Sequence, residues 1–538
     1  MTKVSTITFQ KTGFFSKTIC DYLTQKSSIT DFYENFPDLQ GFEKQIELKR
    51  LSVRACHLER SREMRTTLVG SLKKQYSNLK TSQKVSANIQ SLSQENTFTI
   101  TTGHQLNLFT GPLYFLYKII STINLTEQLK QEFPKENFVP IYWMATEDHD
   151  FEEIQYFNYK DKKITWNRNA SGAVGRLSLQ NMEFVLDEFS KLIGNSDFAK
   201  KLKKLFSDSY LEHSNLTDAT RFLANELFGA YGLVILDGDD VDLKRHFSPF
   251  VKQELFEKIS FTEVSETVKA LEKNYKVQVN PREINLFYLT DKLRERIIFE
   301  DGLFKINNTS IDFTKEELEY ELKLHPERFS PNVIMRPLYQ EVILPNLCYI
   351  GGGGELAYWF ELKDYFNAVN IPFPILLLRN SAVLISGKQS KKLKKLDIST
   401  EELFLKQQEL INRKITEKSE VIIDFSEQRK QIDKHFKELE SIANQTDKSF
   451  VGAVKAQKKK QLNGLDNLEK RLLKAERRVH KDLVDRIVSL QDELFPKKSL
   501  QERNANFSEF YLEYGDQLIP KLKEALKPLN GEFTIIEL

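Results

Sequence analysis

Three carboxylates and an imidazole follow one apolar segment of the chain. The stretch VPIYWMAT, Val139 to Thr146, is typical of a buried strand, and directly after it come Glu147, Asp148, His149 and Asp150. Carboxylates there can hold a substrate ammonium group, accept its proton or bind a metal, and an imidazole titrates near neutrality. Because ligands of parallel sheets bind beyond the carboxyl ends of the strands, we interpret the cluster as an active site. A solvated loop with helix-capping acids is the alternative, and the spacing matches no metal-ligand motif.

A second candidate lies in TGHQLNLFTGP, Thr102 to Pro112, which follows an earlier predicted strand. Gly103 permits a tight turn, His104 and Asn107 offer polar contacts, and the start of the next helix offers backbone N–H groups to an anion. A turn followed by a helix cap would use the same residues. Their chemistry therefore leaves ligand binding and a purely structural turn equally open.

A third candidate is a run of glycines in LCYIGGGGELAYWF, between an apolar run and a helix predicted to begin near Glu355. Backbone without side chains could closely approach a phosphate, a carboxylate or a sugar, and a flexible connection is the alternative. The run is neither a P-loop nor a dinucleotide fingerprint, because no Gly-Lys-Ser/Thr follows and Leu356 takes the place of the last glycine. The four residues are Gly351, Gly352, Gly353 and Gly354.

Other polar residues lie beside predicted core segments. Arg336 and the pair Arg379 and Asn380 could hold a carboxylate of a substrate, since guanidinium groups bind carboxylates in a bidentate manner; structural ion pairs are the alternative. Three aspartates follow another predicted strand, in LVILDGDD, and could contact a ribose or an amine, or cap a helix: Asp237, Asp239 and Asp240.

The composition is that of a globular protein, with 40% hydrophobic and 29% charged residues over 538 positions. Lys+Arg 78 against Asp+Glu 76 gives a formal net charge of +2, so no overall field favours a polyanionic partner such as nucleic acid. Three cysteines without a CxxC pair, Cys20, Cys56 and Cys348, argue against a disulfide framework and suit a reducing compartment. No apolar run is long enough to span a bilayer, and the first residues lack a continuous apolar region, so we expect a cytoplasmic protein.

Strand-like and helix-like segments alternate over residues 1–384, which predicts an α/β domain with a largely parallel sheet. A helix is predicted over Leu113 to Gln131, and insertions are predicted near 161–211 and 260–328. The predicted strands are Thr97 to Thr102, Val139 to Thr146, Gly232 to Asp237 and Phe373 to Leu378.

Residues 385–500 predict a helical coiled-coil module, because glycine and proline become scarce and apolar residues take helical spacing. Asn444 to Ser449 can turn the chain, so an antiparallel hairpin is expected, with Phe450 to Leu494 as one long helix whose uncovered apolar seam favours a homodimer. Lys455 to Arg486 is basic but has no aromatic residue for base stacking, so RNA binding is a distant alternative to a solvated face. Residues 501–538 regain aromatic residues and are expected to pack back on the core.

Four long segments together resemble the bacillithiol synthase family, the cysteine-adding enzymes of bacillithiol biosynthesis. They are TGHQLNLFTGPLYFLYKIISTINL, FVPIYWMATEDHDFEEI, RPLYQEVILPNLCYIGGGGELAYWFELK and PFPILLLRNSA. The resemblance implies a Rossmann-like core with connecting insertions, a coiled coil and a dimer. It also implies a ligase that forms a carbon–nitrogen bond, an amide between cysteine and the amine of glucosaminyl malate, with adenylation of cysteine by ATP as the expected activation and no metal.

The core also looks like that of class I nucleotidyl transferases, so an adenylating ligase for another amine is the alternative. Their histidine motif is only echoed by Gly103-His104 to Asn107, and Lys388 to Lys391 is a partial match to their lysine-rich loop. Under the resemblance, Asp148 and His149 would bind or deprotonate the sugar amine while Glu147 and Asp150 shape the local charge. The glycine run would lie against the sugar or phosphates, and Arg336 and Arg379 would hold malyl or cysteinyl carboxylates.

Overall fold

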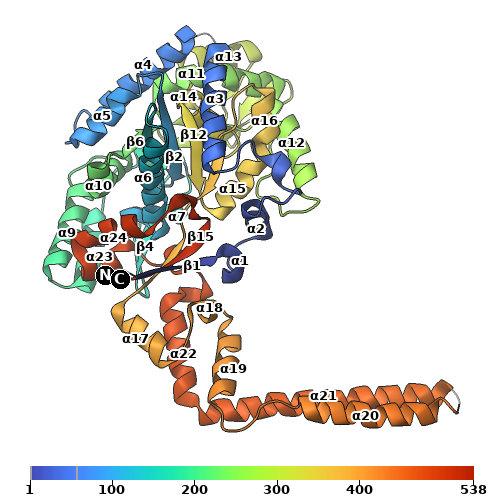
Figure 1. Ribbon diagram of the computed structural model, residues 1–538. Coiled ribbons are helices and arrows are strands. Elements are labelled where there is room, and N and C mark those ends of the chain that lie inside the picture. Colours follow the sequence, from blue (N-terminus) through green and yellow to red (C-terminus); the bar gives the residue numbers. More distant parts are fainter. Residues whose placement is uncertain (1–2, 56–57, 447) are drawn as a thin grey trace. The chain divides into compact units, whose positions relative to one another are not determined.

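The computed structural model describes residues 3–55, 58–446 and 448–538, so Cys56 lies outside the described part (Figure 1). The chain divides into two compact units. The first comprises residues up to 384 together with 499–536, and the second comprises residues 385–498. Each unit is described by itself below.

A five-stranded parallel sheet forms the centre of the first unit (Figure 1). All four predicted strands are present, and the predicted α/β class with a parallel sheet is confirmed. In spatial order the strands are β13 (Ile375–Leu378), β12 (Asn346–Gly351), β2 (Thr97–His104), β3 (Asn137–Met144) and β6 (Val234–Asp237).

Burial on both faces explains why these strands read as continuous runs of apolar and β-branched residues. The helix α6 (Tyr114–Glu132), predicted from Leu113 to Gln131, packs against β2 and β3, and α3 (Leu39–Ala55) packs against β12 and β13. Some polar side chains inside the sheet form hydrogen bonds across strands. Asn346 Oδ1 accepts hydrogen bonds from Thr99 at 3.1 Å and from Thr101 at 2.8 Å, which fixes β12 beside β2.

The first unit contains two additional substructures that are separate from the parallel sheet. The hairpin of β4 (Tyr156–Tyr159) and β5 (Lys162–Thr165) is followed by the helices α8 (Met182–Ile193) and α9 (Asp197–Tyr210). After α12 (Ile259–Leu271) the chain forms a second, antiparallel sheet. Its strands in spatial order are β10 (Asp312–Phe313), β9 (Leu303–Ile306), β8 (Leu293–Glu300), β7 (Leu286–Thr290) and β11 (Phe329–Pro331).

The end of the chain returns to the first unit. Strand β15 (Glu532–Glu537) lies between β1 (Lys3–Thr8) and β14 (Ala382–Ile385) in a three-stranded sheet. A buried ion pair reinforces this return, because Arg379 Nη2 lies 2.7 Å from Glu502 Oε1, while Glu502 Oε2 accepts the backbone N–H of Ala382 at 2.9 Å.

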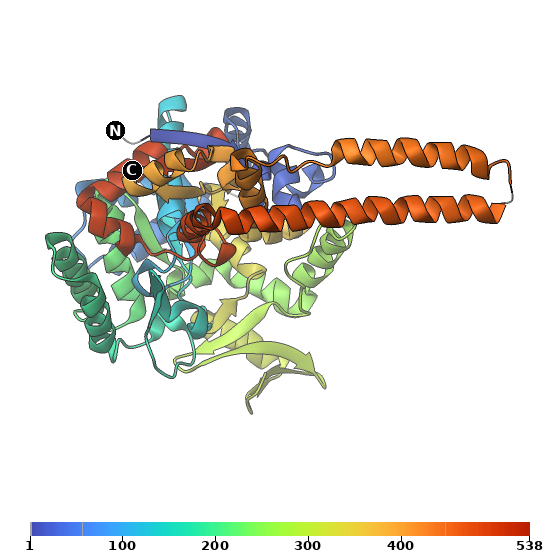
Figure 2. The same cartoon turned by 90° about the horizontal axis from the view of Figure 1, so that it is seen from below.

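The second unit contains an antiparallel pair of helices, α20 (Ser426–Ala443) and α21 (Lys448–Val479), seen side by side in Figure 2. Phe436, Ala443 and Val454 are buried between them. One expectation was wrong: no single helix runs from Phe450 to Leu494. Instead α21 ends at Val479, His480 has non-helical backbone angles, and α22 (Lys481–Leu494) begins after it.

The break has a physical reason in the spacing of the apolar residues. Around Val479, Leu483 and Ile487 the spacing is four residues at each step, so the seam departs there from a heptad and rotates around the helix. Helix α19 (Gln407–Lys418) contacts both α21 and α22. The break therefore lies where one neighbouring helix contacts both segments.

Among the residues that the structure describes, no helix has both the length and the apolar character needed to cross a membrane.

The Arg379–Glu502 pair predicts a large stability effect. In Glu502→Ala the buried guanidinium would lose its partner, so we expect the free energy of unfolding to fall by about 3–5 kcal/mol. Urea unfolding followed by circular dichroism measures this. The matched control is Glu127→Ala, which breaks the partly exposed pair with Lys523 and should cost less than about 1 kcal/mol. Equal losses in the two variants would contradict the assigned role.

Candidate active site

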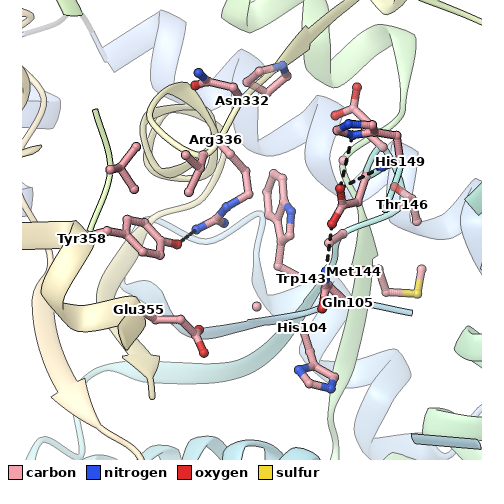
Figure 3. Close-up of a pocket in the computed structure, with 18 of the residues that line it drawn as sticks. His104, Gln105, Trp143, Met144, Thr146, His149, Asn332, Arg336, Glu355 and Tyr358 are labelled. Atoms are coloured by element: carbon pink, nitrogen blue, oxygen red, sulfur yellow. Dashed lines mark hydrogen bonds and ion pairs between the residues drawn. The ribbon is translucent and has the colours of Figure 1, made fainter. Parts of the chain in front are cut away.

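A cavity of about 870 Å³ lies beyond the carboxyl ends of β2, β3 and β6 in the first unit (Figure 3). The segments after these strands form one wall. The antiparallel sheet contributes the opposite wall through β7 and β8, and two helices, α14 (Met335–Ile343) and α15 (Gly353–Trp359), contribute Arg336, Glu355 and Tyr358. In Figure 3, Tyr358 and Glu355 lie on one side of Trp143 and Arg336, and His149 and Thr146 lie on the other.

The structure brings together six of the residues predicted from sequence and leaves the others outside this cavity. The six that line it are Gly103, His104, Glu147, Asp148, His149 and Arg336. Those that do not line it are Asp150, Asn107, Gly351, Gly352, Gly353, Gly354, Arg379 and Asn380.

The residues outside the cavity have structural contacts. Asp150 is exposed and caps the short helix α7 (Phe151–Ile154), where its Oδ1 accepts the backbone N–H of Glu153 at 3.2 Å. Arg379 pairs with Glu502, and Asn380 donates to the carbonyl of Lys527 at 2.9 Å. Asp150 is therefore a helix cap and Arg379 is part of a buried ion pair, which are the structural alternatives to ligand binding.

The glycine run is not the loop that the sequence suggested. Gly351 ends β12, Gly352 precedes α15, and this helix begins at Gly353 rather than near Glu355. None of the four glycines has a positive φ. A Cβ atom on Gly351 would lie 2.7 Å from Leu356 Cδ1 and 3.0 Å from Tyr349 Cε1, so close packing of the strand end against its own helix favours glycine there.

Asp148 and His149 form the acidic end of the cavity together with a residue that sequence reasoning missed, Gln105. The amide of Gln105 donates to Asp148 Oδ2 at 3.0 Å, and the backbone N–H of His149 donates to Asp148 Oδ1 at 2.8 Å. Burial by itself raises the pKa of Asp148, but hydrogen bonds from His149 and Gln105 and the nearby Arg294 outweigh it and hold the pKa well below its usual range. Asp148 is therefore ionised at neutral pH.

The imidazole of His149 is held by an arginine from the antiparallel sheet. Arg294 Nη1 lies 2.7 Å from His149 Nδ1, and because a guanidinium can only donate, Nδ1 must be the accepting nitrogen. The proton of the neutral ring is then on Nε2. Arg294 is itself placed over the ring of Phe287, with its guanidinium carbon 4.0 Å from the ring centre.

Glu147 faces a buried network of charges. It pairs with Lys244 of α11 (Val241–Glu257), whose ammonium group also lies 3.5 Å from Asp239 Oδ1. Burial raises the pKa of Glu147 despite the opposing charge of Lys244. Burial acts in the same direction on Asp239, but Lys244 and the hydrogen bonds of Arg176 prevail and lower its pKa.

The other two aspartates after β6 also have structural roles. Asp240 caps α11 by accepting the backbone N–H groups of Asp242 and Leu243. Asp237 accepts a hydrogen bond from the hydroxyl of Thr146 at 2.5 Å and one from the backbone N–H of Asp239 at 2.9 Å. These contacts tie the end of β6 to the segment after β3 and so support Glu147.

A buried ion pair forms the opposite end of the cavity. Lys118 Nζ lies 2.6 Å from Glu355 Oε1 and donates to the carbonyl of Gly103 at 2.7 Å. The hydroxyl of Tyr349 donates to Glu355 Oε2 at 2.8 Å. Burial lowers the pKa of Lys118, whereas on Glu355 the opposing effect of Lys118 prevails over burial and lowers the pKa of the carboxyl.

Four arginines line the cavity without a carboxylate partner. Within the described ranges, none of them has a carboxylate oxygen within 4.0 Å of its guanidinium nitrogens. Arg336 instead donates to Tyr358 at 3.2 Å and to Gln340 at 3.1 Å, and its guanidinium lies among the rings of Trp143, Tyr349 and Trp359. The four are Arg282, Arg294, Arg296 and Arg336. Their free positive charge can bind an anion.

Sequence reasoning missed Lys118, Glu355 and the arginines of β8. Lys118 lies near the start of a largely apolar helix, where nothing in the local pattern points to a cavity. Arg294 and Arg296 did leave a signal, since residues two apart in a strand share a face. Only the tertiary fold shows that this face turns toward His149, which is 145 positions away in sequence.

One loop of the cavity wall is fixed by a single carboxylate. Glu361 Oε1 accepts the backbone N–H of Gln278 at 2.6 Å, and its Oε2 accepts that of Val279 at 3.2 Å. Gln278, Val279 and Asn280 all line the cavity. Burial raises the pKa of Glu361 to about 7, although both hydrogen bonds act in the opposite direction.

A parallel sheet whose strand ends open into a polar cavity defines a Rossmann-like α/β protein. Comparison with family models is more specific. Residues 2–380 match the N-terminal Rossmann-like domain of bacillithiol biosynthesis BshC, and residues 382–538 match its C-terminal coiled-coil domain. The chain therefore belongs to the BshC family, which confirms the resemblance seen in its sequence motifs.

Curated relatives span nearly the whole chain. A protein named "Putative cysteine ligase BshC" from Flavobacterium johnsoniae is 58% identical, with 98% of this chain and 99% of the relative covered. Proteins of the same name from Flavobacterium psychrophilum and Christiangramia forsetii are 57% and 56% identical, covering 99% and 98% of this chain and 99% and 98% of their own lengths.

The Glu361 clamp predicts a dependence of stability on pH. A carboxyl whose pKa rises on folding stabilises the folded state while protonated, so its contribution is complete below pH 4.5 and is lost as the pH rises to about 7. The loss amounts to as much as about 3 kcal/mol. Urea unfolding between pH 4.5 and 8 should show this slope in the wild-type chain but not in Glu361→Gln. The control is Glu272→Gln, which substitutes an exposed glutamate and should leave the slope unchanged. If the slope also remained in Glu361→Gln, Glu361 would not be the group responsible for it.

Proposed function

We propose that this chain is a ligase of bacillithiol biosynthesis that joins the carboxyl group of cysteine to the amine of glucosaminyl malate through an amide bond. Membership of the BshC family and the cysteine ligase name of its relatives support the pathway and the amino acid. The observation that carries the proposal is the division of charge within one cavity. Carboxylates and an imidazole line one part of it, and arginines without carboxylate partners line another, as a substrate with one amine and two carboxylates requires.

Asp148 is the residue that we assign to the substrate amine. Because the pKa of Asp148 is held low, the carboxylate stays charged and attracts the ammonium form, but the same property makes it a weak base. His149 has its lone pair on Nδ1, which Arg294 occupies. The imidazole can take a proton from the amine only after Arg294 leaves Nδ1, so we propose that substrate carboxylates draw Arg294 away and release His149 as the base.

The arginines supply the opposite charge. Arg336 is restrained by Tyr358, Gln340 and three aromatic rings, which suits bidentate contact with one malyl carboxylate at little cost in side-chain entropy. Arg282 and Arg296 are exposed; Arg296 lies on β8 of the antiparallel sheet and Arg282 on the loop before β7. We assign them to the remaining carboxylate or to a phosphate.

Activation of cysteine is a chemical requirement, because a free carboxylate does not acylate an amine at neutral pH. We propose ATP as the co-substrate that converts the carboxyl group into an activated acyl group. The amine nitrogen then attacks the acyl carbon, the carbon–nitrogen bond forms as the bond to the leaving group breaks, and the amine proton passes to the base.

We also propose that the second unit mediates a homodimer. On α21, the apolar side chains of Leu468 and Val479 have exposed fractions of 54% and 74%. Apolar residues left uncovered along a coiled-coil helix favour pairing with a second copy. Analytical ultracentrifugation of the full chain and of Leu468→Glu tests this, and a monomeric wild-type chain at micromolar concentration would refute it.

Asp148→Asn tests the amine assignment. The substitution removes the charge with little change in shape, so we expect kcat/KM for amide formation to fall about a hundredfold. The matched control is Asp150→Asn, two positions away, where asparagine also caps a helix and activity should remain at the wild-type level. Circular dichroism establishes that both variants fold. Equal activity of the two variants would exclude the assigned role of Asp148.

The reaction itself is tested by mass spectrometry of the purified chain with cysteine and glucosaminyl malate, with and without ATP. We expect a new amide of the summed mass less one water, formed only when ATP is present. A product without ATP would contradict the proposed activation. No product under either condition, from a chain whose fold is verified, would contradict the proposed reaction.

A further inference from the structure

A second, much smaller cavity of about 10 Å³ lies behind the candidate active site, and His104 and Gln105 line both cavities. The small cavity is built from three parts of the first unit. His104, Asn107 and Thr110 come from the end of β2 and the segment after it, Tyr142 comes from β3, and Thr220 comes from α10 (Leu216–Phe228).

Five of the polar side-chain atoms that line this small cavity share an unusual property, because each is buried and lacks a hydrogen-bond partner in the protein. Buried polar side-chain atoms are nearly always hydrogen-bonded, and an isolated exception is costly. Several such atoms facing one cavity indicate a shared polar ligand. The atoms are His104 Nε2, Asn107 Oδ1, Thr110 Oγ1, Tyr142 OH and Thr220 Oγ1.

The backbone that presents these atoms is held in place by other contacts. Phe109 and Thr110 both have positive φ angles, 47° and 68°, which is a strained conformation for residues other than glycine. The backbone N–H of Phe109 donates to the hydroxyl oxygen of Tyr210 at 2.8 Å. Asn506 donates to the carbonyl of Phe109 at 2.9 Å. Thr110 is therefore fixed toward the cavity rather than free to turn away.

We propose that the small cavity binds one ordered water molecule and that this water fixes which ring nitrogen of His104 carries the proton offered to the active site. The volume corresponds to a single water, and the polar partners exceed the two to four that a buried water needs. The role given to His104 rests on the proposed function, whereas the water site itself does not.

The donors and acceptors that line the cavity determine the orientation of this water. Asn107 donates through Nδ2 to the carbonyl of Glu153 at 3.3 Å, so its Oδ1 faces the cavity and can only accept. The hydroxyls of Thr110, Tyr142 and Thr220 have no hydrogen-bond partner in the protein, and we assign those of Tyr142 and Thr220 to donate to the water oxygen. Both protons of the water are then directed to acceptors, Asn107 Oδ1 and His104 Nε2.

The consequence concerns the protonation of His104. Nε2 accepts from the water, so the proton of the ring is on Nδ1, the nitrogen that is not sealed in the small cavity. Burial and the nearby Lys118 lower the pKa of His104 well below its usual value, so the ring stays neutral. His104 is thus a positioning residue that donates Nδ1–H toward the active site, not a base.

The first test needs no substrate. A crystal structure of the full wild-type chain should contain one water peak within about 2.7–3.2 Å of His104 Nε2 and Asn107 Oδ1. Nitrogen NMR of the chain labelled in its histidine rings, with His104→Gln identifying the signal, should show protonated Nδ1 and no titration between pH 5 and 9. No peak in the cavity, or a ring protonated at Nε2, would overturn the proposal whether or not the chain makes the amide.

A second test uses Thr220→Val, which removes one hydroxyl and keeps the shape of the side chain. We expect a mixture of His104 tautomers and a fall in kcat/KM of about tenfold. The control is Thr126→Val on α6, a buried threonine whose hydroxyl bonds to the carbonyl of Ile123 away from the cavity. Unchanged tautomers in Thr220→Val would show that the water does not set the ring and would refute the positioning role.

Discussion

The parallel register of the central sheet is the constraint on which the site depends. Strand β2 is paired along its whole length with β3, so that His104 lies beside Met144 and both strands end at the same edge. Everything that follows β3, including Glu147 and Asp148, is therefore delivered to the segment that follows β2. Hydrogen bonding between the strands fixes their register. Residues that follow two neighbouring strands therefore become neighbours in space although they are far apart in sequence.

Charge is separated within the cavity by its walls. The segments that follow the parallel strands carry Glu147, Asp148 and His149, and the antiparallel sheet carries Arg294 and Arg296. Carboxylates and guanidinium groups that lie so close together would be expected to form ion pairs with each other. They do not, because Glu147 is already paired with Lys244 and Asp148 is satisfied by Gln105 and the backbone. The guanidinium groups remain available because each neighbouring carboxylate already has its donors.

Much of the fold could be predicted from the sequence, because strands buried on both faces are continuous runs of apolar and β-branched residues. The cluster at Glu147 to His149 was found for the same reason, since it directly follows such a run. Asp150 belongs to the same motif, yet the chain turns after His149 and leaves its side chain capping a helix. Local sequence does not encode the direction of such a turn.

The structure departs from the sequence interpretation at several places, each for a distinct physical reason. The glycine run suggested a ligand loop, but at Gly351 the structure shows a steric reason for glycine, which is the packing of Leu356 and Tyr349 against the strand end. Arg379 was interpreted as a substrate contact because its buried partner, Glu502, is 123 positions away. The break at His480 followed from a change in apolar spacing that was visible in the sequence, but its effect depends on how α19 packs against both helices.

Glu355 gives the candidate site a property of a different kind. The carboxylate neutralises Lys118 and also accepts the backbone N–H of Gly352 at 3.3 Å, at the start of a helix that begins with two glycines. Glycine makes this first turn entropically costly to order. The carboxylate of Glu355 that balances the ammonium group of Lys118 therefore also limits fraying of α15. One side chain couples the charge balance of the cavity to the order of the backbone. Local opening of this helix and solvation of Lys118 are then a single cooperative event, and amide hydrogen exchange at the start of α15 reports on the charge state of the cavity.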